Sequence, residues 1–167
     1  EMALSCARLE SDSTDYVIRS LPLEQIVKPA VRKYAPMFIS KKLSLEMSSL
    51  TATVLTDEKW AQFIVEQILS NSLKYTRTGH IRIWQKDPAA LVIEDTGIGI
   101  DPADIPRLGE RGFTGYNGRL DKKSTGIGLY LCKEISRRLS HTLTIESEPG
   151  KGTRVTIDFA TRQLQAE

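Results

Sequence analysis

The stretch TDEKWAQFIVEQILSNSLKY, residues 56–75, carries the strongest structural signal in the chain. Thr56 and Asp57 offer an N-cap, and acidic residues in the first turn suit the positive end of a helix dipole. Apolar side chains then recur at helical spacing on one face, namely Trp60, Phe63, Ile64 and Ile68. The stretch is therefore predicted to form an amphipathic helix.

Two amides continue this apolar stripe and make the helix unusual. Gln67 and Asn71 follow at spacings that keep side chains on one helical face, so we expect both to point toward the core. An unsatisfied buried amide costs about 1–3 kcal/mol, so each needs a protein or ligand partner. A core asparagine bonded to backbone explains Asn71 alone equally well. Lys74 and Tyr75 lie one turn further on and add a cation and an aromatic face, which favours a binding site.

Outward from this helix, the pattern predicts strands interleaved with two further helices. The predicted elements are a helix over 23–39, strands within 43–47 and 52–55, a hairpin of 80–85 and 91–94, a helix from 126 to 139, and a closing hairpin of 142–147 and 153–159. Pro29 is expected to kink the first helix or shift its start. Together they favour an α+β class, a two-layer sandwich with three helices on one face of a mixed, mostly antiparallel sheet.

Composition sets broad limits on the protein class. The 167 residues are 40% hydrophobic and 26% charged, as in one ordinary globular domain. A net charge of +2 is too weak to indicate nucleic acid or a membrane surface as partner. Cys6 and Cys132 fit neither a metal site nor a disulfide framework, which favours the cytosol, and no apolar run approaches the ~18 residues of a transmembrane helix. We expect a helix stub and linker at 1–17, one domain at 18–160 and a tail at 161–167.

Three glycine-rich motifs have both a structural and a functional explanation. In DTGIG, residues 95–99, the glycines serve a tight turn, or Asp95 is a buried carboxylate that accepts a hydrogen bond from a ligand amine. TGIGL, residues 125–129, is a flexible helix entry, or its N–H groups bind phosphate. GKGT, residues 150–153, is most often a hairpin turn. The long loop at 97–125 is a candidate lid.

These glycines match neither of two common nucleotide motifs. A dinucleotide fingerprint needs a third glycine where Pro102 stands. A P-loop around Lys151 would need glycine in place of Ile145, and serine or threonine in place of Gly152. Walker-type and Rossmann-type nucleotide binding are therefore excluded.

Taken in order, the Asn71 helix and the motifs at 95–99, 126–129 and 150–153 resemble the four boxes of the histidine-kinase-type ATPase (Bergerat) fold. Gyrase, a class of heat-shock chaperones and the mismatch-repair ATPases share this fold. The resemblance covers about residues 21–159. The stub ARLE, residues 7–10, and the lid block GFTGYNGR, residues 112–119, are most similar to bacitracin-responsive, intramembrane-sensing kinases of Gram-positive bacteria.

The resemblance implies a role for each matching position. At the adenine end, Asp95 would accept the amino group, Tyr75 would lie against the base and Thr153 would join the surrounding hydrogen bonds. At the metal end, Asn71 would hold Mg²⁺, a hard cation that suits an oxygen donor, and Lys74 would reach the phosphates of ATP. Further nucleotide contacts would come from Gly97, Gly99, Ile100, Thr125, Gly126, Gly128 and Leu129, and from a lid arginine, Arg111 or Arg119.

One position separates kinases from hydrolases within this family. Members that hydrolyse ATP carry glutamate one turn before the metal asparagine, to accept a proton from water. This chain has Gln67 there, and an amide cannot act as a base. The catalytic set, Gln67, Asn71 and Lys74, therefore favours transfer of the γ-phosphoryl group to a protein side chain.

The acceptor is expected in another part of the protein. His80 begins a predicted strand and His141 follows a helix, so both are assigned structural or solvent roles. The phosphoacceptor histidine would lie on a dimerisation domain upstream, of which residues 1–17 keep the end of the second helix and a linker. The resemblance further implies a response regulator as partner, and a homodimeric full-length protein anchored in the cell membrane. The 167 residues themselves would be cytoplasmic and monomeric.

Two other classes remain open on the same fold. A serine kinase of the anti-sigma-factor type would lack a preceding dimerisation helix. A nonenzymatic nucleotide-sensing module would bind ATP and transfer nothing to histidine.

Overall fold

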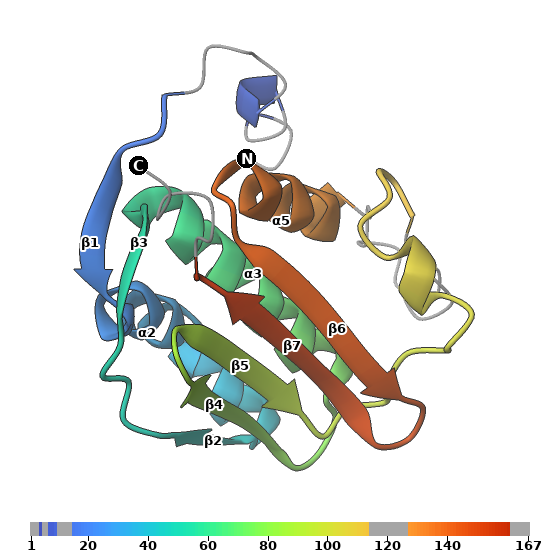
Figure 1. Cartoon of the computed structure of the whole chain (residues 1–167). Coiled ribbons are helices and arrows are strands. Elements are labelled where there is room, and N and C mark those ends of the chain that lie inside the picture. The colour runs from blue at the N-terminus through green and yellow to red at the C-terminus, as the bar shows by residue number, and fades with distance from the viewer. Residues whose placement is uncertain (1–3, 5–6, 10–14, 114–126, 161–167) are drawn as a thin grey trace.

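The computed structural model describes residues 4, 7–9, 15–113 and 127–160, and the structural statements below concern these residues. Five strands form a mixed sheet, and three long helices lie behind it in one layer (Figure 1). The sheet order is β2 (Ser44–Met47), β4 (His80–Lys86), β5 (Ala90–Asp95), β7 (Gly152–Asp158) and β6 (Thr142–Glu148). The helices are α2 (Leu23–Lys41), α3 (Glu58–Tyr75) and α5 (Ile127–Arg138). The predicted α+β sandwich is confirmed.

The central helix α3 begins where the sequence predicts. The Asp57 carboxylate accepts the Trp60 N–H at 2.9 Å, so Asp57 is the N-cap. The side chains buried on α3 are those of Trp60, Ala61, Ile64, Val65, Ile68, Leu69, Ser72 and Leu73. They repeat every three or four residues and face the sheet, which explains why this segment gave the clearest signal.

Gln67 and Asn71 of α3 do not lie on that buried face. The prediction that Gln67 and Asn71 point into the core is wrong, because Asn71 is exposed and Gln67 is half-buried. The buried row runs from Trp60 through Ile64 and Ile68 to Ser72, at intervals of four. Gln67 and Asn71 follow Phe63 along the adjacent row, which turns away from the sheet. Burial therefore does not demand a partner for Asn71, but its amide is accessible to a ligand.

Helix α2 packs beside α3 and begins at Leu23, so Pro29 does not shift its start. Pro29 and Pro36 both lie inside the helix. The helix ends at Lys41 and is capped by Lys42, whose positive φ of 55° lets its N–H bond back to the last turn. None of the helices in the described segments is long and apolar enough to span a membrane.

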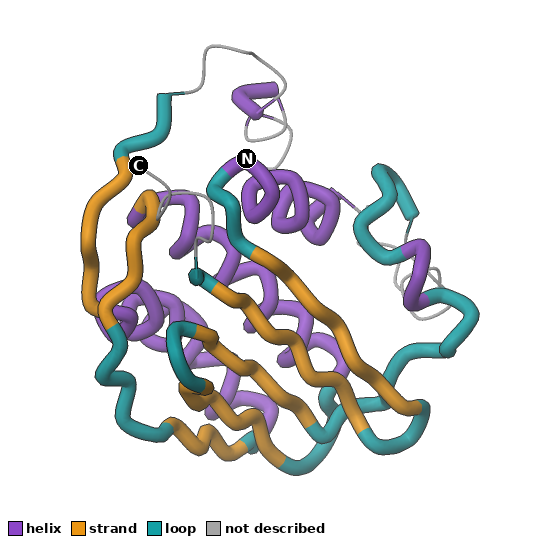
Figure 2. The backbone as a smooth tube through the Cα atoms, in the orientation of Figure 1, coloured by secondary structure: helices purple, strands orange, loops and turns teal. Residues whose placement is uncertain are grey.

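Both predicted hairpins are present, β4 with β5 and β6 with β7, each antiparallel. Strand β2 joins the edge of the sheet parallel to β4. Inward-facing side chains such as Ile81, Ile83 and Ile93 are buried against the helices. Figure 2 shows the strands lying in one layer with the helices behind.

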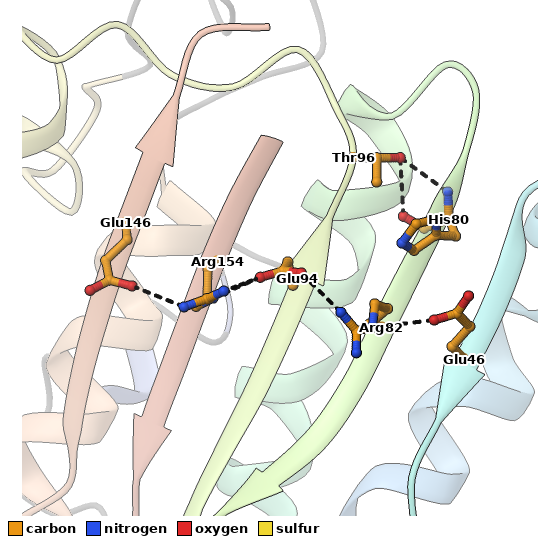
Figure 3. A network of polar contacts seen from close by, with 7 residues as sticks. All are labelled: Glu46, His80, Arg82, Glu94, Thr96, Glu146 and Arg154. Atoms are coloured by element: carbon orange, nitrogen blue, oxygen red, sulfur yellow. Dashed lines mark hydrogen bonds and ion pairs between the residues drawn. The ribbon is translucent and has the colours of Figure 1, made fainter. Parts of the chain in front are cut away.

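The opposite face of the sheet carries a row of charges that crosses all five strands. Its members, here called the charge ladder, are Glu46, Arg82, Glu94, Arg154 and Glu146, each directly opposite the next in register (Figure 3). The closest contacts join Arg154 Nη2 to Glu94 Oε2 at 2.6 Å and Arg82 Nε to Glu46 Oε2 at 3.2 Å. Side chains alternate between the two faces of a strand, so the ladder faces away from the helix layer.

A second, two-stranded sheet was not predicted as such. Strand β3 (Thr53–Asp57) corresponds to the predicted run at 52–55, but it pairs with β1 (Ile18–Pro22) rather than with the main sheet. In β1 only Leu21 is buried, and the strand ends in proline, so its sequence shows no alternation. Its pairing depends on β3 and could not be found locally.

Candidate nucleotide site

The DTGIG motif begins with the last residue of β5, where sheet, α3 and the β6–β7 turn meet. Asp95 is 6% exposed and lies directly opposite Thr153 of β7. Thr153 in turn lies directly opposite Ser147 of β6. Directly opposed residues point to the same face of a sheet, so the three side chains form one row on the face that carries the helices.

The Asp95 carboxylate is the best-defined polar group in this region. Its Oδ1 accepts the N–H of Gly97 at 2.9 Å and the N–H of Thr153 at 3.2 Å. The hydroxyl of Ser72, one residue after Asn71 on α3, also donates to this carboxylate. Burial raises the pKa of Asp95 above its usual range, and the bonds from Gly97, Ser72 and Thr153 partly oppose that rise.

The glycines after Asp95 are in close contact with protein backbone. A Cβ on Gly97 would lie 2.5 Å from the carbonyl oxygen of Tyr75. Gly99 has φ +74°, and a Cβ there would lie 2.2 Å from the carbonyl oxygen of Glu148. Both glycines are therefore required for packing between α3 and the β6–β7 turn. Approach of a ligand to Gly97 and Gly99 stays a prediction.

Backbone bonds hold the residues after Asp95 against α3 and the β6–β7 turn. Ile98 donates its N–H to the Tyr75 carbonyl at 3.1 Å and accepts from Gly150 N–H at 2.8 Å. Ile100 donates its N–H to Ser147 Oγ at 2.8 Å. The structure thus brings together Tyr75, Asp95 and Thr153, which were predicted to lie at the base, and Ile100, which was predicted as a further nucleotide contact.

The C-terminal end of α3 carries Lys74 and Tyr75, both half-buried. The Lys74 Nζ lies 5.4 Å from the centroid of the Tyr75 ring. Lys41, from the end of α2, donates to the Leu73 carbonyl, one of the last carbonyls of α3. A cation there also suits the negative end of the helix dipole. Lys41 therefore stabilises the turn from which Lys74 and Tyr75 project, and burial lowers its pKa.

Helix α5 packs against α3 and carries two of the predicted nucleotide contacts. Gly128 and Leu129 lie in its first turn and are half-buried. The predicted contacts Thr125, Gly126 and Arg119, with the part of the candidate lid from residue 114 to residue 125, fall outside the described residues.

The described base of that loop, residues 98–113, is tied to α5. It contains a short 3₁₀ turn, η1 (Ile105–Arg107), and Lys133 Nζ donates to the Leu108 carbonyl at 2.5 Å. The guanidinium of Arg111 lies 6.0 Å from the centroid of the Tyr130 ring, also on α5.

Sequence reasoning missed three residues of this region. Ser72 and Ser147 contact Asp95 and Thr153, but a single serine in a helix or strand carries no local signal. Thr76 is fully buried beside Gly97, and within the described part of the chain its Oγ1 has no hydrogen-bond partner. Its position directly after Tyr75, at the helix end, was the only available sign.

A bound Mg²⁺ is compatible with the residues present. Asn71 offers an amide oxygen on an exposed face of α3, immediately before Ser72, which contacts Asp95. Mg²⁺ keeps several waters and usually takes only one or two protein ligands together with substrate phosphates, so a single accessible oxygen donor is sufficient.

Comparison with known proteins identifies the class. The chain belongs to the family of histidine kinase-, DNA gyrase B- and HSP90-like ATPases, whose model matches residues 56–163. This confirms the resemblance inferred from the four motifs.

The most similar relatives include sensor kinases of Bacillus subtilis (strain 168). The chain is 34% identical over 168 residues to the sensor histidine kinase YxdK, covering 97% of this chain and 52% of YxdK. It is 34% identical over 158 residues to the sensor protein BceS, covering 93% and 47%. The chain thus spans about half the length of these curated relatives. The fold matches full-length ShkA in complex with AMPPNP with a TM-score of 0.80 and 19% identity, over 96% of this chain and 35% of that one.

Proposed function

We propose that this domain binds Mg²⁺-ATP and transfers the γ-phosphoryl group to a histidine on the dimerisation domain of a two-component sensor kinase. Asp95 is the observation that carries the proposal. A carboxylate offers about four acceptor positions, and Gly97, Thr153 and Ser72 supply three donors. One position is left for the amino group of adenine. In support, ShkA, which shares this fold, is described in complex with AMPPNP.

The other end of the site handles the phosphates. Asn71 holds Mg²⁺, which neutralises charge as the phosphoryl group moves, and Lys74 adds a second cation. Gly128, Leu129 and the preceding Thr125 and Gly126 present backbone N–H groups to the triphosphate. Gln67, half-buried one turn before Asn71, orients a neighbouring group but takes no proton, so hydrolysis of ATP by water is slow.

Neither described histidine is suited to accept the phosphoryl group. His141 is 6% exposed and its Nε2 lies 2.8 Å from Thr56 Oγ1. His80 is half-buried at the start of β4, which lies between β2 and β5 in the sheet. The acceptor therefore belongs to a dimerisation domain of the same kinase, which is a homodimer anchored in the cell membrane and passes the phosphoryl group to a response regulator.

Mixing the domain with a separately prepared histidine-bearing helical domain and γ-labelled ATP tests the transfer. Label that is lost in acid and retained in base, as expected for phosphohistidine, is the predicted result. Acid-stable label on serine would instead support an anti-sigma-type serine kinase. No label on any protein, despite ATP binding, would support a nucleotide-sensing module.

A further inference from the structure

Ser147 makes three hydrogen-bond contacts at the edge of the proposed adenine site. Its Oγ accepts the N–H of Ile100 at 2.8 Å and donates to the carbonyl oxygen of Gly152 at 2.8 Å. It also lies 2.8 Å from Thr153 Oγ1. Ser147 thus connects the loop after Asp95 to β7 through one oxygen atom.

Counting protons fixes the direction of the bond between the two hydroxyls. A hydroxyl has one proton and two lone pairs. The Gly152 carbonyl has no proton to give, so the single proton of Ser147 must occupy that contact. One lone pair of Ser147 takes the Ile100 N–H, and the other is left for Thr153. The proton of Thr153 therefore points at Ser147, and each of the three contacts then contains one proton.

This direction determines what Thr153 offers to a ligand. With its proton committed to Ser147, the Thr153 hydroxyl has only lone pairs free. Asp95, its neighbour in the row, is also an acceptor. Two adjacent acceptors match a group that carries two N–H protons. They disfavour a carbonyl oxygen at the same place, because two acceptors facing each other share no proton.

We propose that Ser147 is a positioning residue that holds Thr153 as a hydrogen-bond acceptor, so that Asp95 and Thr153 together select a purine with an amino group at C6 over one with an oxo group. This inference rests on the proposed ATP function. It assigns part of the base selectivity to Ser147, which acts through Thr153 and does not itself contact the base.

The test compares ATP with ITP, which has the 6-oxo group and the same sugar and triphosphate. Binding of both is measured by calorimetry at fixed Mg²⁺ for the wild type, Ser147→Ala, Thr153→Val and the double variant. Wild type should prefer ATP by at least about tenfold, as expected for a polar mismatch in a built site. In Ser147→Ala the freed Thr153 hydroxyl can turn and donate to the oxo group, so the ATP/ITP preference should fall at least about threefold.

The double variant provides the matched control. If Ser147 acts through Thr153, adding Ser147→Ala to Thr153→Val should leave the ATP/ITP preference unchanged. An unchanged or increased preference in a folded Ser147→Ala variant would overturn the inference, while ATP binding to the wild type would keep the proposed function intact. A wild type that binds neither nucleotide would reject both.

A second measurement does not depend on Ser147→Ala folding. The analogue 1-deaza-ATP lacks the N1 acceptor of adenine but keeps the amino group. If Thr153 accepts from the amino group, Thr153→Val should weaken ATP and 1-deaza-ATP by the same factor. If Thr153 instead donates toward N1, the loss should be confined to ATP, which would contradict the assigned proton direction.

Discussion

At the scale of single residues, Asp95 combines burial with a carboxylate that is already largely occupied by protein donors. Its pKa is raised chiefly because burial disfavours the charged form, and the donors from Gly97, Ser72 and Thr153 only partly compensate. Ionising Asp95 in the folded protein therefore costs stability, as it does for many carboxylates at functional sites.

Replacing Asp95 by Asn separates the effect of its charge on stability from its role in binding ATP. A folded-state pKa above the unfolded value means that the ionised carboxylate lowers stability once the pH exceeds the ordinary aspartate range. We expect Asp95→Asn to melt at pH 7 no lower than the wild type, while ATP binding falls at least about 30-fold because the new NH₂ opposes the adenine amine. Calorimetric titration measures the ATP affinity, and a thermal melt measures the melting temperature. A large loss of melting temperature with retained binding would contradict the assignment.

Acid should act on the same group in the wild type. As the pH falls through the raised pKa of Asp95, the carboxyl gains a proton and loses acceptor capacity. ATP affinity should therefore begin to weaken at a higher pH than an ordinary aspartate would produce. The ATP affinity of the wild type can be measured with a fluorescent ATP analogue between pH 7.5 and pH 4.5. Asp95→Asn serves as the reference, because it has no carboxyl group to titrate at this position. If the affinities of the two proteins fall in parallel as the pH is lowered, Asp95 is not the cause.

At the scale of secondary-structure elements, α3 carries residues proposed for both ends of the site, and a side chain from another helix bonds to its C-terminal turn. The donor is Lys41 on α2, bonded to the Leu73 carbonyl. Lys41→Met should lower the free energy of unfolding by about 1 kcal/mol, since one helix-end carbonyl loses a charged donor. Urea unfolding measures it, and the exposed Lys86→Met is the control, expected to change little. Equal effects of the two variants would rule out the capping role.

The charge ladder stabilises the arrangement of the strands on the other face. Glu94 contacts both ladder arginines, whereas Glu46 at the edge contacts one. Glu94→Gln should cost about 0.5–1 kcal/mol in urea unfolding at low salt, and Glu46→Gln less, because these groups are partly exposed. The difference should shrink in 0.5 M NaCl. A loss that is insensitive to salt would point to packing instead of charge.

Most elements could be predicted because their signals are local. The apolar period of α3, its Asp57 cap and the alternation in β4 and β7 each depend on neighbouring residues. Strand β1 escaped prediction because its pairing with β3 joins segments 30 or more residues apart. The direction of Asn71 was misjudged for a related reason: Phe63 and Trp60 both fit an apolar stripe, and only the packing of the sheet decides which row is buried.

The order of the motifs along the chain predicted the family, but the bonds between them were not predictable. Ser72 bonds to Asp95, 23 positions away, and Ser147 bonds to Thr153, 6 positions away. Only the fold brings these residues into contact. Single serines give no periodicity or spacing to detect.

At the scale of the whole molecule, His141 joins the main sheet to the smaller one. Its ring contacts Thr56 of β3 and packs edge-on against Phe159, with centroids 4.8 Å apart. Burial lowers its pKa to about 4, with Asp158 opposing that change. The folded protein therefore holds this imidazole neutral between pH 6.5 and about 4.

Acidification should weaken the whole domain through this residue. The unfolded chain binds a proton at His141 below pH 6.5 and the folded one does not, so stability should fall progressively from pH 6.5 to about 4. The loss from this group should reach about 2–3 kcal/mol. His141→Gln should flatten the curve of unfolding free energy against pH, and His80→Gln should not. If the unfolding free energy depends on pH in the same way in the wild type and in His141→Gln, His141 is not the cause.

We propose that one site binds adenine at Asp95 and a metal-bound triphosphate at Asn71. Titration of ATP with and without Mg²⁺, on wild type and Asn71→Ala, tests it most directly. The wild type should bind ATP more tightly with Mg²⁺, and Asn71→Ala should lose most of that metal-dependent gain while keeping the metal-independent binding. Identical Mg²⁺ dependence in the two proteins, or no ATP binding by a folded wild type, would contradict the account.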